Sequence, residues 1–265
     1  MKLKNKTIIL VGASKGIGRE LAFQLAERGN SLILFSRHIK SLQDDPRYKQ
    51  LPHPPRLFPG DVKNQADIDF LAAQIGDSEQ LDGVIYCAGV SRPDFVESPE
   101  IERAVDTIQV NLEGAIRVIY RFLPKLMACP GSFIAGFTSM AGDRGMPRGH
   151  TYSASKAGFD RFLDSLRIDL LDKRINVFTI IPGYVESPMS DQNKFPMPGR
   201  WPAPKAASFL INQLEKECLI IRFPWYHALG MAIMGLIPNF LYWRIMNQNS
   251  REVKIIPQSD DHYKW

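Results

Sequence analysis

Cysteine is scarce in this chain of 265 residues, and its three cysteines, Cys87, Cys129 and Cys218, form no CxxC pair. Their odd number and wide spacing argue against a disulfide framework and against a cysteine-rich metal site. The five histidines also lack the spacing of metal ligands. We therefore interpret the thiols as small buried side chains in a reducing compartment, and we predict no metal site.

Runs of like charge are also missing, although the formal net charge is +5 and the sequence pI is near 9.1. The basic residues are scattered and do not alternate with aromatic residues, which argues against a nucleic-acid-binding surface. The positive charge instead suits a phosphorylated cofactor or a membrane surface. No secretory cleavage pattern follows the first lysines, so we expect the chain to begin inside the fold, and we expect a cytoplasmic protein.

What the sequence does contain is a regular alternation of short apolar runs and amphipathic stretches. The predicted strands are 7–11, 31–35, 56–59, 83–86, 132–137, 176–180 and 218–223. The predicted helices are 17–28, 65–75, 103–127, 153–171 and 204–217. Strands that are apolar throughout and separated by helices predict an α/β fold with a doubly wound parallel sheet of about seven strands and helices on both faces. Ligands of such a sheet bind beyond the carboxyl ends of its strands.

A glycine-rich loop follows the first predicted strand. Its residues are Gly12, Ala13, Ser14, Lys15, Gly16, Ile17 and Gly18, with the spacing G-x-x-x-G-x-G. Glycines allow a tight turn and a close approach of the backbone to a pyrophosphate, while the helix N-terminus offers free N–H groups. A glycine trio also occurs in ordinary loops, but its place between a strand and a helix favours a nucleotide-binding site.

The residues after the second predicted strand indicate which nucleotide binds. An NAD site usually has a carboxylate there to bind the ribose 2′-hydroxyl. This chain has Ser36, Arg37 and His38 instead. Arg37 and Lys15 carry the charge needed to neutralise a 2′-phosphate, so we predict NADP(H) as the cofactor. The alternative is that Arg37 only occupies the exposed end of a strand.

Further motifs follow in a fixed order. They are Asp61-Val62, Ala88-Gly89, Asn111 within the long predicted helix, Ser139, the Tyr152-x-x-x-Lys156 signature and Pro182-Gly183. Together with the glycine loop, these motifs resemble the short-chain dehydrogenase/reductase superfamily over about residues 6–187. The resemblance implies one Rossmann-fold domain over 1–265, with a cofactor-binding and catalytic core at 1–187.

The same resemblance implies the roles of the site residues. Tyr152 would donate a proton to a carbonyl oxygen, and Ser139 would hold that oxygen by a hydrogen bond. Lys156 would lower the pKa of the Tyr152 phenol and bind the nicotinamide ribose, and Asn111 would position a water beside Lys156. Cofactor contacts are implied for Gly12, Ser14, Lys15, Gly16, Ile17, Gly18, Arg37, Asp61, Val62, Ala88, Gly89, Tyr152, Lys156, Pro182, Gly183, Val185 and Ser187.

The chain departs from the family pattern at a few positions. Val11 replaces a threonine, Tyr86 and Cys87 replace two asparagines that brace the central strands, and Ser187 replaces a threonine that bonds the carboxamide. Because Ser187 keeps a hydroxyl, we expect its contact with the cofactor to survive. We interpret Cys87 as a buried thiol at a strand end rather than a nucleophile.

The last third of the chain is expected to select the substrate. Residues 188–204 are rich in proline and apolar side chains and are interpreted as a mobile lid; they include Met189, Phe195, Met197 and Trp201. The predicted lid and helix together span 188–217, and the last strand with an apolar segment spans 218–246.

From Phe223 to Trp243 the chain has no Lys, Arg, Asp or Glu, and Trp225 and Trp243 stand near the two ends of this stretch. Aromatic and basic flanks favour a peripheral membrane contact through residues 223–246. The alternative is a helical pair that packs on the substrate cleft or on a subunit. We further expect a homodimer or homotetramer.

The leading hypothesis is an NADPH-dependent oxidoreductase that reduces a 3-oxoacyl, lipid or steroid-like ketone. An alcohol dehydrogenase that runs the same chemistry in the oxidative direction is a second hypothesis. A protein that binds NADP(H) as a sensor without catalysis is a third, and loss of the Tyr, Lys or Ser would favour it. None of these residues is missing from the sequence.

Overall fold

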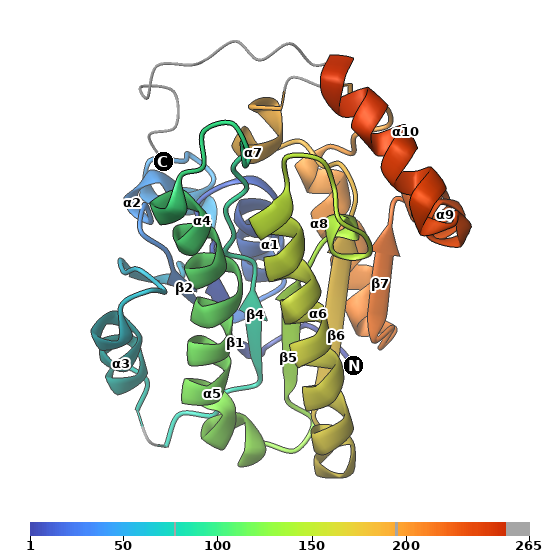
Figure 1. The fold of residues 1–265 in the computed structure, drawn as a ribbon. Helices are drawn as coiled ribbons and strands as arrows, with labels where there is room; N and C mark the ends of the chain where they lie inside the picture. Colours follow the sequence, from blue (N-terminus) through green and yellow to red (C-terminus); the bar gives the residue numbers. More distant parts are fainter. Residues whose placement is uncertain (77, 194–195, 253–265) are drawn as a thin grey trace.

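Seven parallel strands form one sheet in the order β3-β2-β1-β4-β5-β6-β7 (Figure 1). The computed structural model describes residues 1–76, 78–193 and 196–252. The strands are β1 Thr7–Val11, β2 Ser31–Phe35, β3 Arg56–Phe58, β4 Gly83–Tyr86, β5 Phe133–Phe137, β6 Asn176–Pro182 and β7 Ile220–Phe223. The predicted fold class, an α/β doubly wound parallel sheet, is confirmed.

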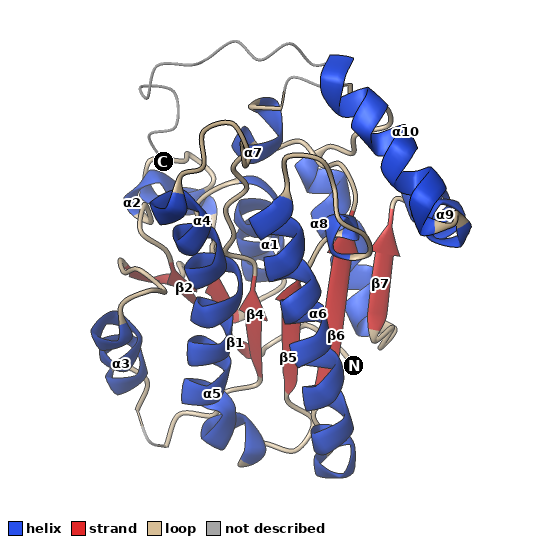
Figure 2. Cartoon of the chain, viewed as in Figure 1, coloured by secondary structure: helices blue, strands red, loops and turns tan. Residues whose placement is uncertain are grey.

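Helices cover both faces of this sheet, and the strands form the middle layer in Figure 2. The α-helices are α1 Gly16–Glu27, α2 Lys40–Gln43, α3 Gln65–Ala73, α4 Ile101–Ile108, α5 Gly114–Met127, α6 His150–Leu170, α7 Pro188–Asp191, α8 Ala203–Glu215, α9 Trp225–Leu236 and α10 Asn239–Glu252. Short 3-10 turns are η1 Tyr48–Gln50, η3 Met140–Gly142 and η4 Leu171–Lys173, and η2 Gln109–Glu113 is a π-turn. Helices α4, α5 and α6 lie in front of the sheet in Figure 1, and α1 and α8 lie behind it.

The side chains of each central strand alternate between two apolar cores. In β1, Ile8 and Leu10 join the core made with α1 and α8, while Ile9 joins the core made with α3, α5 and α6. All three are fully buried. Because both faces are covered, the strands are apolar throughout, which is why they could be recognised in the sequence.

The helix predicted at 103–127 differs from the structure. It begins earlier, at Ile101, and is divided into α4 and α5 by the π-turn at Gln109–Glu113. A π-turn adds one residue to a helical turn and often marks a functional position. The apolar spacing of the sequence does not show this insertion, and Asn111 lies inside it.

The predicted lid region contains local structure. Ser187 caps the short helix α7, and a parallel bridge joins Val185 to Trp201. Of the apolar residues named for this region, Phe195 lies outside the described residues.

The charge-free stretch after β7 forms a helical pair. Pro238 separates α9 from α10, and α9 packs beside β7 at the edge of the sheet (Figure 1). Within residues 1–76, 78–193 and 196–252, no helix is both long and apolar enough to cross a membrane. A helical pair is compatible with both alternatives, so the partner of this segment stays a prediction.

Candidate active site

The glycine loop lies where the strand order reverses, between β1 and β4. Gly12 adopts a φ of +87°, and a Cβ at this position would lie 2.4 Å from the backbone nitrogen of Ala88. Only glycine allows this backbone to approach the loop after β4 so closely. The structure thus brings the predicted Gly12 and Ala88-Gly89 motifs into contact at the crevice where such sheets bind ligands.

The N-terminus of α1 points into the same crevice. Lys15 is the N-cap residue, but its side chain makes no capping hydrogen bond, and the first turn holds no acidic residue. The first N–H groups of a helix lack intrahelical acceptors and attract anions. A dinucleotide pyrophosphate fits this arrangement, with Gly16 and Ile17 at its edge. A Cβ on Gly16 would lie 3.1 Å from the Cβ of Ser187, so the loop after β6 faces the glycine loop.

The ends of β1, β2 and β3 form a polar group beside the glycine loop. Ser36 Oγ donates to Ser14 Oγ at 3.0 Å, which places the residue before Arg37 against the loop. Arg37 Nη1 lies 4.0 Å from Asp61 Oδ2, and both side chains are partly exposed. The guanidinium is therefore held near the crevice by a loose ion pair that leaves donors available for a phosphate. The side chain of Val62, in contrast, is buried in the core.

Tyr152 and Lys156 lie one turn apart on α6, and Lys156 is only 4% exposed. The Lys156 Nζ donates to the carbonyl oxygen of Phe137 at 2.9 Å and lies 5.9 Å from the centre of the Tyr152 ring. Burial lowers the pKa of Lys156 from 10.5 to about 8, because a buried ammonium loses hydration. This lysine can therefore change protonation state near neutral pH.

Ser139 lies at the end of β5 and makes a hydrogen bond with Tyr152. Its Oγ also accepts from Ala141 N at 3.1 Å, which fixes the hydroxyl at the start of η3. Burial raises the pKa of Tyr152, and the bond with Ser139 acts in the opposite direction. The lowering by Lys156 that we expected is thus not the main influence on Tyr152 in the chain alone. A raised pKa keeps the phenol protonated, the state required of a proton donor.

Asn111 is fully buried inside the π-turn. Its Oδ1 accepts from Val90 N at 2.8 Å, and its Nδ2 donates to Val90 O at 2.9 Å and to Ser155 Oγ at 3.0 Å. A Cβ on Gly89 would lie 3.3 Å from both Asn111 Oδ1 and Lys156 Nζ. Asn111 therefore ties the loop after β4 to the helix that carries Tyr152 and Lys156.

The Pro182-Gly183 loop continues β6 along the same edge. Gly183 N donates to Phe223 O at 2.7 Å, which keeps the start of the loop on the sheet beside β7. Ser187 Oγ accepts from Ser190 N at 3.1 Å as part of a capping box. The Ser187 hydroxyl that we expected to bind the cofactor is thus also the N-cap of α7, and it donates to Ser190 Oγ at 3.3 Å.

Cys87 lies directly behind the glycine loop. Burial raises the pKa of its thiol to about 12, and Gly18 N–H donates to the sulfur. The sulfur is therefore protonated at neutral pH and shows no sign of nucleophilic activation.

Asp94 is a positioning residue that sequence reasoning missed. Its carboxylate accepts from Thr151 N and from Thr151 Oγ1, both at 2.8 Å, and so caps the first turn of α6. A carboxylate at a helix N-terminus also interacts favourably with the helix dipole. Nothing in the sequence indicates this contact, because Asp94 and α6 are separated by α4, α5 and β5.

Arg144 and His227 were missed for the same reason. Arg144 follows η3 and donates to Met234 O, to Ile237 O at 3.0 Å and to Asn239 Oδ1 at 2.6 Å. It thereby binds the turn between α9 and α10. Tyr242 OH reinforces this link by donating to Gly145 O at 2.8 Å.

His227, on α9, holds the loop after β6. Tyr184 N donates to its Nδ1 at 3.3 Å, and Nε2 lies 2.9 Å from Pro198 O. The neutral tautomer with the proton on Nε2 satisfies both contacts. Tyr226 OH adds a hydrogen bond to Gly199 O at 2.7 Å. Helix α9 therefore contacts the chain just before the segment that we interpret as the lid, at Tyr184, and also contacts that segment itself, at Pro198 and Gly199.

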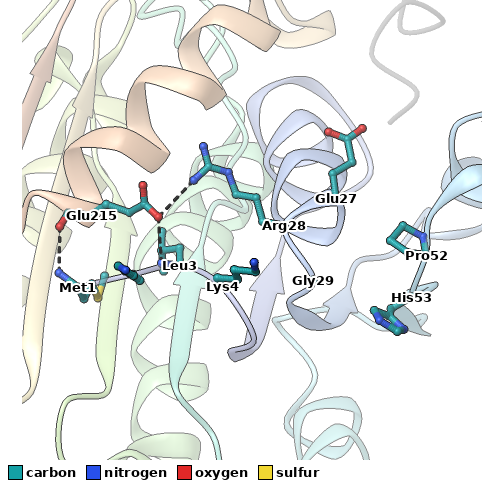
Figure 3. A pocket seen from close by; sticks show the side chains of 10 residues that line it. Met1, Leu3, Lys4, Glu27, Arg28, Gly29, Pro52, His53 and Glu215 are labelled. Atoms are coloured by element: carbon teal, nitrogen blue, oxygen red, sulfur yellow. Dashed lines mark hydrogen bonds and ion pairs between the residues drawn. The ribbon is translucent and has the colours of Figure 1, made fainter.

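A surface hollow of about 690 Å³ lies at the opposite edge of the sheet (Figure 3). Its polar contacts centre on Glu215, which accepts from Leu3 N at 3.1 Å and pairs with Arg28 at 3.2 Å. These contacts join the segment before β1 to the ends of α1 and α8. We interpret the hollow as a structural joint, because the catalytic loops all leave the other edge.

A family model described as short chain dehydrogenase matches residues 6–196. An uncharacterized oxidoreductase of Myxococcus xanthus is 30% identical over 245 residues, which cover 91% of this chain and 96% of that protein. An 11-beta-hydroxysteroid dehydrogenase-like 4A protein of Arabidopsis thaliana is 33% identical over 190 residues, covering 70% of this chain and 63% of that protein. The crystal structure of a short chain dehydrogenase from Burkholderia cenocepacia in complex with NADP superposes with a TM-score of 0.78 at 23% identity, covering 93% of this chain and 99% of that one.

Lys156→Met should stabilise the chain without cofactor. Below about pH 8 the folded chain buries a charged Lys156, while the unfolded chain keeps its ordinary pKa of 10.5. Because each pKa unit corresponds to about 1.4 kcal/mol, we expect the free energy of unfolding to rise by about 1–3 kcal/mol at pH 7.

The gain in the free energy of unfolding of Lys156→Met over the wild type should shrink between about pH 8 and 10.5, because the folded wild-type chain loses the Lys156 proton there while the unfolded chain still holds it. Urea unfolding of both chains across this pH range measures the difference. Lys173→Met, at an exposed lysine in η4, is the matched control and should show no such pH dependence. A gain for Lys156→Met that does not change with pH would contradict a buried ammonium.

His227→Ala should loosen the loop after β6. The Tyr184 N–H loses its acceptor and Pro198 O loses its donor, so amide exchange at Tyr184 should accelerate about fivefold or more. Hydrogen exchange followed by mass spectrometry on peptides covering 183–187 measures this change. His53→Ala, at an exposed histidine, should leave these peptides unaffected, and equal effects of the two variants would refute the role of His227.

Proposed function

The chain belongs to the short-chain dehydrogenase family and is an oxidoreductase, and we propose that it uses NADPH to reduce the carbonyl group of a lipophilic ketone. The observation that carries the proposal is the group formed by Ser139, Tyr152 and Lys156. These residues meet at the carboxyl edge of the sheet, on the side of the crevice that faces the loops after β4 and β6.

In the proposed reaction, a nicotinamide cofactor held by the glycine loop would supply the hydride that reduces the carbonyl carbon. The Tyr152 hydroxyl gives its proton to the carbonyl oxygen, so the ketone becomes a secondary alcohol. Ser139 holds the oxygen with a hydrogen bond while negative charge develops on it. The pair of residues is already in hydrogen-bond contact, so little rearrangement is required before the proton moves.

Lys156 then restores the proton on Tyr152. Its Nζ lies 5.9 Å from the centre of the Tyr152 ring, and its pKa near 8 makes the proton available at neutral pH. Asn111 keeps Lys156 in place indirectly, since its bonds to Val90 and Ser155 join the loop after β4 to α6. The reverse reaction, oxidation of an alcohol, would use the same residues.

The preference for NADPH rests on the charge at the end of β2. Lys15 follows Ser14 and Arg37 follows Ser36, so the Ser14–Ser36 hydrogen bond brings two basic residues to the place where the ribose 2′-phosphate of a bound nucleotide would lie. Asp61 follows β3 rather than β2, and its carboxylate lies 4.0 Å from Arg37 and 3.9 Å from Lys63, so it does not stand where an NAD site has its acceptor for the ribose 2′-hydroxyl. A 2′-phosphate would gain two cationic partners here.

A lipophilic substrate is supported by the composition of the loop over the site. Tyr184, Met189 and Met197 offer partly buried apolar surface in the segment that follows β6. The relative from Arabidopsis thaliana, named as 11-beta-hydroxysteroid dehydrogenase-like, is consistent with a substrate of this class. A sensor that binds NADP(H) without catalysis is disfavoured, because Ser139, Tyr152 and Lys156 are all retained.

Tyr152→Phe should lower kcat for ketone reduction by about 100- to 10,000-fold, because the proton donor is removed. The Kd for NADPH should change little, since the ring and its packing remain. Steady-state kinetics on a panel of aliphatic, acyl and steroid ketones, with NADPH binding followed by fluorescence, tests both statements. Tyr120→Phe, at an exposed tyrosine on α5, is the matched control. Unchanged turnover by Tyr152→Phe would refute the assignment of this residue.

Arg37→Glu should raise the KM for NADPH by about tenfold or more and change the KM for NADH much less. A carboxylate at this place repels a 2′-phosphate but can accept from a 2′-hydroxyl. The comparison requires kinetics with both cofactors on the same ketone. Lys173→Glu, the same charge reversal at the opposite edge of the sheet, should affect neither value. An equal effect of Arg37→Glu on the two cofactors would remove the argument for NADPH.

A further inference from the structure

Helix α9 has two faces of different character. The inner face carries His227, which holds the loop after β6, and the C-terminal end of the helix is bound by Arg144. The outer face carries Trp225, Leu229, Ile233 and Leu236, which are 70%, 52%, 56% and 85% exposed. Their spacing places them on one stripe of the helix.

Helix α10 also carries exposed apolar side chains. Phe240, Leu241 and Trp243 are 72%, 43% and 64% exposed. Figure 1 shows α10 next to α9 at the upper edge of the molecule, above the carboxyl end of β7. Together these residues of α9 and α10 form what we call the outer hairpin surface. A large exposed apolar surface of this kind marks a contact with another molecule or a membrane.

The charged residues of this segment indicate which kind of partner the outer hairpin surface binds. From Phe223 to Gln248 the chain has no Asp or Glu, and Arg244 is its single charged residue. Among the described side chains, Arg244 has no ion-pair partner. An apolar segment that carries a cation and no carboxylate of its own complements the hydrocarbon boundary and anionic headgroups of a bilayer. Trp225 and Trp243 also fit this interpretation, because tryptophan is enriched at the level of the lipid headgroups.

A protein partner fits this surface less well. Protein interfaces contain about one hydrogen bond for every 100–200 Å², which fixes the register of the two surfaces. The side chains that form the outer hairpin surface offer only the indole N–H groups of Trp225 and Trp243 for this purpose. Binding to a bilayer surface does not require hydrogen bonds that fix a register. Within the part of the chain that the structure describes, no helix is long and apolar enough to cross the bilayer. We propose that the outer hairpin surface binds the surface of an anionic lipid bilayer.

This proposal goes beyond the oxidoreductase activity and does not depend on it. It also has a geometric consequence for the site. The element that would contact lipid is the same element that holds the loop after β6 through His227 and the loop after η3 through Arg144. The bilayer would therefore lie beside the loops that cover the substrate, and a lipid-dissolved ketone would reach them directly.

Flotation of the purified full chain with vesicles tests the proposal. The vesicles are phosphatidylcholine alone and an equal mixture of phosphatidylcholine and phosphatidylglycerol. We expect the wild-type chain to float with the mixture and to bind it more strongly than phosphatidylcholine. Ile233→Asp should lower the partition coefficient at least about tenfold, because an apolar contact is lost and a carboxylate faces the headgroups.

Phe70→Asp is the matched control, since Phe70 on α3 is 57% exposed against 56% for Ile233. It should bind vesicles like the wild type. Arg244→Gln should reduce binding to the anionic mixture and leave binding to phosphatidylcholine unchanged. Thermal unfolding of each variant establishes that it is folded before its binding is compared.

Three results would overturn the proposal. The wild-type chain could fail to float with both kinds of vesicle, or Phe70→Asp could lose binding as strongly as Ile233→Asp. In the third, sedimentation velocity without lipid would show that Ile233→Asp dissociates a wild-type dimer, which would assign the surface to a second copy of the chain. NADPH-dependent turnover without lipid tests the proposed function separately, and its presence or absence does not change these outcomes.

Discussion

The parallel direction of all seven strands is the constraint on which the candidate site depends. It brings the carboxyl end of every strand to one edge, so the loops that follow β1, β2, β4, β5 and β6 meet there. The register is fixed by burial on both faces, since a slip of one residue would turn each apolar side chain to the opposite core. In β5, for example, Phe133 faces one core and Ile134 the other. Ser139 can meet Tyr152 only while this register holds.

The same constraint explains why much could be predicted from the sequence. A strand buried on both faces is an uninterrupted apolar run, and the bounds of β1, β2 and β4 were predicted without error. Most of the candidate site residues directly follow such a run, so their place at one edge follows from the topology. Tyr152 and Lys156 needed only the period of a helix. The helix bounds and the π-turn were harder to predict, because the spacing of apolar residues does not reveal one inserted residue.

Contacts between distant segments could not be predicted. Asp94 caps α6, and Arg144 and His227 hold the hairpin of α9 and α10, yet none of them belongs to a pattern in the sequence. The pKa values of the site residues could not be predicted either, because the pKa of a side chain depends on the groups that surround it in the fold. The sequence suggested that Lys156 and a cationic bound nicotinamide would lower the pKa of the phenol; in the chain without cofactor, burial raises the pKa of Tyr152 and lowers that of Lys156. Both effects arise from the same loss of hydration, acting on groups of opposite charge.

The hairpin of α9 and α10 shows how one short helix can serve two purposes. A helix of this length is marginal in isolation and needs tertiary contacts to form. Here polar contacts take part: Arg144 binds the carbonyl groups at the end of α9, and His227 and Tyr226 bind the loop after β6. Because polar contacts on the inner face hold the helix, its outer face is free of the need to pack against the protein core. The apolar stripe there contributes little to the fold of the single chain, and its composition is explained best by a contact outside the chain.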